Sequence, residues 1–181
     1  HGKIHKGGVV NYAQIRNTLC KTLATASKNK NSYVTTMFDL YGLPADVPGA
    51  TDAQKVTDPY GKVEFIEREI QRAEGYDGTF FFPYIELHEF EAMIFSDITK
   101  LEEVYFDYDL TALKECAKLQ SNPELINDGV ETSPSKRIVN CINCFDKANV
   151  GVDVMGKIGI ENIANKCRHF GEWIKQLEAR I

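Results

Sequence analysis

Acidic residues that follow two apolar runs are the groups in this sequence best suited to chemistry. Asp39 comes directly after the run 33–38, and Glu89 and Glu91 come just after the run 80–87. Ligands of open α/β sheets bind at the carboxyl ends of the strands, and carboxylates are natural ligands of Mg²⁺. We therefore expect these three residues to be ligands of Mg²⁺ or Mn²⁺. The alternative is that Asp39 begins a turn and that the glutamates stabilise a helix dipole.

His88 precedes Glu89 and could orient the site or move a proton, although a packed histidine bonded to backbone is an equal alternative. No second histidine follows at i+4, so the segment is not the metalloprotease pattern. Glu89 and Glu91 are two residues apart and diverge on a regular helix. They converge only if the helix begins at about Glu89 or later.

Two adjacent cations, Lys136 and Arg137, follow Pro134 and Ser135 at the start of a predicted helix. Cations at this end oppose the helix dipole, whereas a helix N-terminus is itself a site for anions. We therefore expect Ser135, Lys136 and Arg137 to bind phosphate, with Lys136 also catalytic. The alternative is a pair of solvated basic residues.

The five cysteines are odd in number and scattered, so we expect a reducing cytoplasm rather than a disulfide framework. Cys141 and Cys144, together with Cys167 and His169, could alternatively supply four ligands to a structural zinc ion.

The chain of 181 residues carries a net charge of −5, unevenly distributed. Residues 1–38 carry +6, residues 39–131 carry −14 and residues 132–181 carry +3. This is not the basic composition of a typical nucleic-acid-binding domain, but an acidic middle between basic ends suits a metal site beside an anion-binding surface. The alternative is that the acids merely solvate helix faces.

No apolar run approaches the ~20 residues of a membrane span, and no signal peptide is visible. Because the chain opens at His1, we expect it to be processed, tagged or cut from something longer.

The elements that must position these residues follow from hydrophobic periodicity and from turn residues. Both apolar runs are nearly continuous, as in a parallel sheet covered on both faces. We expect an α/β layered fold. Strands are predicted over 33–38 and 80–87, and helices over 11–26, from Pro59 to Gly75, and over 89–95, 101–104, 110–119, 136–144, 159–166 and 169–179.

Residues 40–79 contain one predicted helix and therefore suit a single right-handed crossover between parallel strands. Such a crossover presents the same end of both strands to the same side. We therefore expect Asp39, Glu89 and Glu91 to converge at one edge of the sheet, and the loop 127–135 to bring Lys136 to that edge.

The order and spacing of several stretches resemble the bacterial family called domain of unknown function 4276, which is grouped with TOPRIM-like domains. The stretches are 33–44 with 48–49, 83–97, 122–129, 132–137 and 166–170. The resemblance implies a TOPRIM-like Rossmannoid layer, with a mostly parallel sheet flanked by helices and a helical C-terminal part. It also implies a single domain over 1–181 that lacks its N-terminal strand and a catalytic Glu in a Val-Glu-Gly-x-Thr-Glu type segment.

By the same resemblance, the chain is expected to be a Mg²⁺-dependent nuclease acting on phosphodiesters of DNA or RNA. Its expected catalytic residues are His88, Glu89, Glu91 and Lys136. Relatives of this kind work as effectors beside ATPases of the overcoming-lysogenization-defect type in phage defence, which implies an ATPase partner. Only Asp39 stands where the Asp-x-Asp motif has two acids. That departure favours the alternative of a non-catalytic docking or sensor module for the ATPase. A phosphohydrolase acting on nucleotides is a third hypothesis.

Overall fold

The computed structural model describes residues 11–76, 78–126 and 132–180, which fall into two compact units, His1–Ile85 and Glu86–Ile181. The protein is of the α/β class, as expected, and 61% of the described residues are helical. That these two units make up one TOPRIM-like domain stays a prediction.

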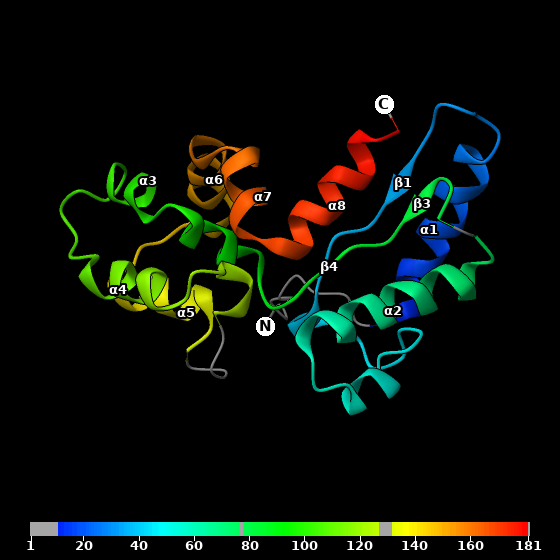
Figure 1. Ribbon diagram of the computed structural model, residues 1–181, viewed down its shortest axis with the longest axis horizontal. Helices are drawn as coiled ribbons and strands as arrows, with labels where there is room; N and C mark the ends of the chain where they lie inside the picture. The colour runs from blue at the N-terminus through cyan, green and yellow to red at the C-terminus, as the bar shows by residue number, and fades with distance from the viewer. Residues whose placement is uncertain (1–10, 77, 127–131, 181) are drawn as a thin grey trace, which may run out of the picture. The chain divides into compact units, whose positions relative to one another are not determined.

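In the first unit, two helices accompany short paired strands (Figure 1). Strands β1 and β3 pair in parallel, with Val34 opposite Phe81 and Thr35 opposite Phe82, while β2 pairs with β4, where the chain enters the second unit. Helix α1 packs on β1 and α2 packs on β3. The bounds are α1 Tyr12–Ala26, β1 Val34–Thr35, β2 Phe38–Asp39, α2 Pro59–Glu74, β3 Phe81–Phe82 and β4 Ile85–Glu86, with 3-10 turns η1 Leu40–Gly42 and η2 Asp52–Lys55 before α2.

The strands are shorter than predicted, because side chains and a proline interrupt the backbone ladder. Pro83 has no N–H to donate and separates β3 from β4. The Thr35 hydroxyl donates to the Phe82 carbonyl over 2.5 Å, and the Thr36 hydroxyl accepts the Tyr84 N–H over 3.2 Å. The predicted strands 33–38 and 80–87 are therefore each two strands of two residues.

Both helices of the first unit begin and end where the sequence predicts. The Asn11 side chain caps α1 by accepting the Gln14 N–H, and Asp58 caps α2 by accepting the Gly61 N–H. Gly75 ends α2 in the left-handed region, with φ of 73°, a conformation that glycine adopts without steric cost.

A buried carboxylate joins α1 to α2. Glu74 accepts hydrogen bonds from the Tyr12 hydroxyl at 2.8 Å, Arg16 Nε at 2.9 Å and Cys20 Sγ at 3.0 Å. The three donors are four residues apart and so share one face of α1. Burial by itself raises the pKa of Glu74, but the hydrogen bonds from Cys20, Tyr12 and Arg16 outweigh it, so the pKa lies below its ordinary value.

The second unit is helical and surrounds a buried 3-10 segment, η3, which contacts α4, α5, α6 and α7. Every residue from Glu91 to Ser96 is buried. Helices α4 and α5 lie side by side (Figure 1). The bounds are η3 Phe90–Ser96, α3 Ile98–Glu102, α4 Thr111–Leu119, η4 Pro123–Leu125, α5 Pro134–Cys141, η5 Lys147–Gly151, α6 Val152–Ile158, α7 Ile160–Lys166 and α8 Arg168–Glu178.

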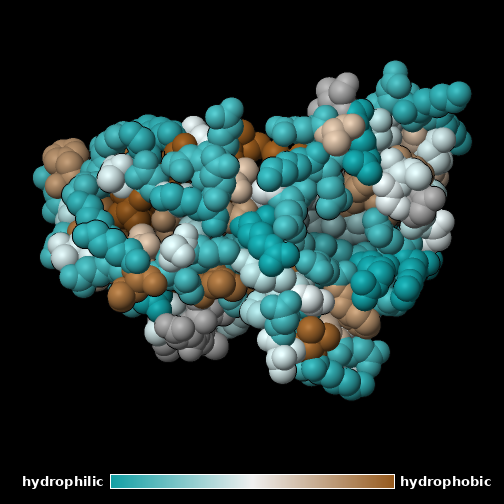
Figure 2. All heavy atoms as spheres, in the orientation of Figure 1, coloured by the Kyte–Doolittle hydropathy of each residue, from teal (hydrophilic) through white to brown (hydrophobic). Residues whose placement is uncertain are grey.

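Four sequence predictions differ from this unit. The segment 89–95 is a 3-10 helix rather than an α-helix, and α3 begins three residues before the predicted 101–104. Helix α5 runs over Pro134–Cys141 rather than 136–144, and 147–158 forms one turn of π-helix and an α-helix that were not predicted. Gly151 and Gly156 interrupt that last segment and lower its helix propensity. None of the helices in the described ranges is long and apolar enough to cross a membrane. Figure 2 shows one face of the molecule, where hydrophilic side chains predominate.

Candidate functional site

Glu89 lies against the N-terminus of α5, where the sequence predicts a phosphate. Its Oε2 accepts the backbone N–H of Ser135, the second residue of α5, over 3.0 Å. Glu89 itself is extended and precedes η3, so its side chain is not constrained by a helical turn. The positive end of the α5 dipole favours this carboxylate. The protein's own glutamate thus takes one of the backbone donors expected for an anion.

The two cations of α5 have different surroundings. Arg137 Nε donates to the Thr132 carbonyl over 2.6 Å and so fixes the backbone just before the helix. Lys136 is exposed and forms no ion pair with the residues the structure describes. Because Lys136 follows Ser135 directly, its backbone lies next to the Glu89 contact. A role in phosphate binding therefore fits Lys136 better than Arg137. Most of the predicted loop, 127–131, lies outside the described residues.

Glu91 has a cationic partner that the sequence did not indicate. Its carboxylate is 6% exposed, and its Oε1 lies 2.9 Å from the Lys147 ammonium, which is 49% exposed. A buried carboxylate requires such a partner, because an uncompensated charge in the interior is costly. Glu89 and Glu91 are thus held by different elements, α5 and η5.

Asp39 is exposed, ends β2 and precedes η1. It lies in the first unit, whereas Glu89 and Glu91 lie in the second. Their convergence at one sheet edge, and with it the shared metal site, stays a prediction. His88 is half-buried immediately before Glu89, and its proposed proton-shuttling role stays a prediction too.

The surroundings of the Glu89 carboxylate suit a hard cation better than those of the Glu91 carboxylate do. Among the described residues, Glu89 is contacted through Oε2 alone and Glu91 through Oε1 alone. The second oxygen of each carboxylate is of the type that Mg²⁺ prefers. Beside Glu91, however, the Lys147 ammonium would repel a cation. Glu89 is therefore better placed than Glu91 to hold a cation, and binding of an ion by either residue stays a prediction.

Sequence reasoning missed a fully buried glutamate, Glu124, at a second helix N-terminus. Its two oxygens accept the N–H groups of His169 at 2.9 Å and of Phe170 at 2.8 Å, in the first turn of α8. Both partners lie in stretches already noted, 122–129 and 166–170. The sequence therefore shows an acid in one stretch and the start of a predicted helix in the other. Nothing in it indicates that Glu124 contacts that helix.

Cys167, which precedes α8, is buried and chemically protected. Burial is the main cause that raises its pKa to about 12, and the charges of Glu124 and Glu86 add to it. A thiol with such a pKa stays protonated near neutral pH and is a poor nucleophile and metal ligand. Within the part of the chain that is described, Cys141, Cys144, Cys167 and His169 do not gather into a metal-binding group. The structural zinc alternative is therefore wrong.

The fold and these contacts define an α/β protein in which motif glutamates hold the starts of two helices. A family model described as "Domain of unknown function (DUF4276)" matches residues 1–178, so the chain belongs to this family, which confirms the resemblance noted from the sequence. No curated protein and no solved structure matches the chain.

Proposed function

We propose that this chain is a metal-dependent nuclease of TOPRIM type that acts on nucleic-acid phosphodiesters in the cytoplasm, as the effector of an ATPase-containing phage-defence system. One observation supports it most: the Glu89 carboxylate contacts the backbone of α5 next to Lys136. This juxtaposition brings together a ligand for a hard cation and a cation for a phosphate. A TOPRIM-like layer, in which Asp39 stands at the same edge, is part of the proposal.

Each residue has a distinct role in this proposal. Glu89, oriented by the Ser135 N–H, is the principal ligand of the ion. Asp39 and Glu91 are the further ligands that the sequence predicts, and Glu91 would have to exchange its Lys147 partner for the ion. A bound Mg²⁺ or Mn²⁺ activates water and stabilises charge on the reacting phosphate. Lys136 neutralises charge on the phosphate oxygens, and His88 accepts or returns a proton.

The test is a calorimetric titration of the full chain with Mg²⁺ and Mn²⁺. Glu89→Gln keeps an oxygen that accepts the Ser135 N–H but removes the charge, so it is expected to weaken ion binding at least about tenfold, or about 1.4 kcal/mol. Glu161→Gln, on an exposed residue of α7, is the matched control and should bind as the unmodified chain does. Cleavage is then measured on plasmid DNA, on tRNA and on a panel of nucleotides, which separates a nuclease from a nucleotide phosphohydrolase. Equal ion binding by both variants would refute the role of Glu89.

A second candidate is a non-catalytic docking or sensor module for the ATPase. The ion pair between Glu91 and Lys147 favours it, because a carboxylate neutralised by the protein has less need of a metal. This candidate predicts that the chain binds neither Mg²⁺ nor Mn²⁺ and leaves every substrate of the panel intact, while still binding the ATPase.

A further inference from the structure

A pocket of about 370 Å³ in the second unit is unusually rich in lysine. The end of η3, the start of α3, one side of α4 and the last residue of α7 line it. Its charged lining residues are Lys114, Lys118, Lys166 and a single acid, Asp97. In a chain with a net charge of −5, a cavity with this excess of cations is a local exception.

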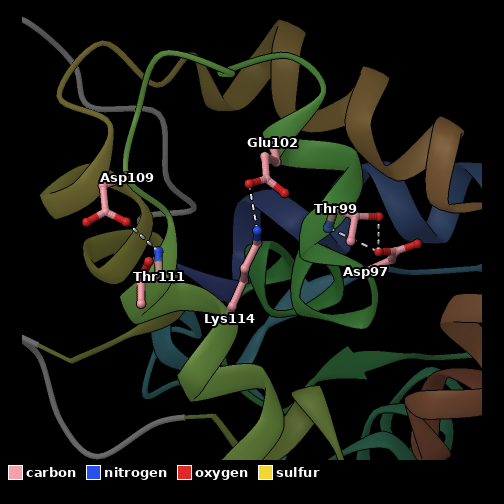
Figure 3. Close-up of polar contacts among 6 residues, drawn as sticks. All are labelled: Asp97, Thr99, Glu102, Asp109, Thr111 and Lys114. Carbon is pink, nitrogen blue, oxygen red and sulfur yellow. Dashed lines mark hydrogen bonds and ion pairs between the residues drawn. The ribbon is translucent and has the colours of Figure 1, made fainter.

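Lys114 is paired with a carboxylate, and Asp97 is hydrogen-bonded within α3. Lys114 reaches from α4 to Glu102 of α3, and its ammonium lies 2.6 Å from Oε1 (Figure 3). Asp97 caps α3: its Oδ1 accepts the N–H of Thr99 at 3.1 Å and the Thr99 hydroxyl at 2.6 Å (Figure 3). The charge of Lys114 is thus balanced by Glu102, whereas Asp97 keeps its negative charge and uses it to cap α3.

The other two lysines have no carboxylate partner in the described part of the chain. The Lys166 ammonium donates to the Ser96 carbonyl over 2.7 Å, a neutral acceptor that positions the charge without cancelling it. Lys118 is exposed and takes part in none of the ion pairs of the described residues. The pocket therefore offers two positive charges from two different helices.

Lysines in the last turn of a helix stabilise the dipole, and Lys118 and Lys166 stand in the last turns of α4 and α7. That effect explains each position along its own helix. The dipole effect does not require the two side chains to line one cavity. A helix C-terminus carries only about half a negative charge, so each ammonium group keeps part of its positive charge. The remaining charge is suited to an oxyanion, which ammonium groups bind as point charges.

We propose that this pocket binds a phosphate group, with the ammonium groups of Lys118 and Lys166 as the donors. The site contains none of the residues assigned to the metal or to α5, so it needs no divalent ion. Its ligand is either the backbone of a nucleic acid or a small phosphate compound, since both present the same chemistry.

The experiment measures binding of a labelled single-stranded oligonucleotide to the full chain by fluorescence anisotropy, in EDTA and over a range of salt concentrations. Lys118→Gln and Lys166→Gln are each expected to weaken binding about tenfold, as for loss of one charge-assisted contact. Each substitution is also expected to reduce the slope of log K against log salt by about 1, the value for loss of one phosphate contact. Lys157→Gln, an exposed lysine of α6 outside the pocket, is the matched control.

Competition by inorganic phosphate and by a mononucleotide distinguishes the two ligand sources. If both displace the oligonucleotide at low millimolar concentration, the ligand is a small phosphate compound; if neither does, it is a polymer backbone. Lys166→Gln removes the contact to the Ser96 carbonyl, so the thermal unfolding of this variant is recorded as well. If Lys166→Gln does not fold, the result for Lys118→Gln is the test of the proposal. The proposal is overturned if the unmodified chain binds no phosphate probe, or if Lys118→Gln binds as tightly as Lys157→Gln. Because EDTA removes divalent ions, failure here is separable from failure of the nuclease proposal.

Discussion

Replacing Glu124 with alanine removes a fully buried carboxylate from the first turn of α8. The two N–H groups of His169 and Phe170 lose their acceptor at the same time. A hydrogen bond to a charged group contributes about 1.5–3 kcal/mol, and a buried donor left without a partner costs about 1–3 kcal/mol. We therefore expect Glu124→Ala to lower the free energy of unfolding by about 3–5 kcal/mol. Glu124→Gln retains one acceptor oxygen, so we expect it to lower the free energy of unfolding by only about 1–2 kcal/mol.

The assay is urea unfolding followed by the fluorescence of Trp173, the single tryptophan of the chain. Trp173 lies on α8, and its ring centroid is 5.5 Å from that of Phe170, so it reports on the helix that Glu124 holds. Glu115→Ala, on an exposed residue of α4, is the matched control and should stay within about 0.5 kcal/mol of the unmodified chain. A Glu124→Ala variant within about 1 kcal/mol of the unmodified chain would refute the reasoning.

Three further outcomes follow from other contacts. Gly171→Ala would press a Cβ against the backbone oxygen of Ala164 in α7 and should lower the free energy of unfolding in urea by at least about 2 kcal/mol. Gly156→Ala, with open space around it, should be neutral or stabilising. The pKa of Glu74 is lowered on folding, so its contribution is present above the unfolded value of about 4.5 and is lost as pH falls through the folded value; Glu74→Gln should flatten the decline in thermal midpoint below about pH 4.5. Lys147→Met leaves the buried Glu91 without its cation and should lower the free energy of unfolding by about 1–3 kcal/mol, the cost of a buried polar group that loses its partner, read from the same urea titration.

The elements that the sequence predicts well are those fixed by neighbouring residues. The start of α1 depends on Asn11, three residues from its partner, and the end of α2 depends on Gly75. The strands depend instead on distant groups. The Thr35 hydroxyl bonds to the Phe82 carbonyl, 47 residues away, and such a contact leaves no periodic signal. The same reason explains η3: its burial on all sides removes the amphipathic pattern from which a helix type is predicted.

The residues of the candidate site can also be found in the sequence, whereas the contacts between them cannot. Glu89 and the start of α5 are each conspicuous in the sequence, one as an acid after an apolar run and the other as a proline followed by cations. That they meet, across 46 residues, depends on the packing of η3 against α5. Lys147 was missed because it lies in a π-turn with no recognisable motif.

The two motif glutamates therefore differ in what they can offer to an ion. A hydrogen bond from outside the coordination sphere orients a metal-bound carboxylate and is a common companion of metal ligands. The Ser135 N–H is such a donor to Glu89, and it carries no full charge to compete with a cation. Lys147 does carry one, only 2.9 Å from Glu91. A pair of ions about 4 Å apart, as in two-metal sites, would have to displace that ammonium. In the proposed nuclease, the contacts of the second unit thus favour Glu89 over Glu91 as the ligand of the ion, because Glu91 is paired with the protein's own cation.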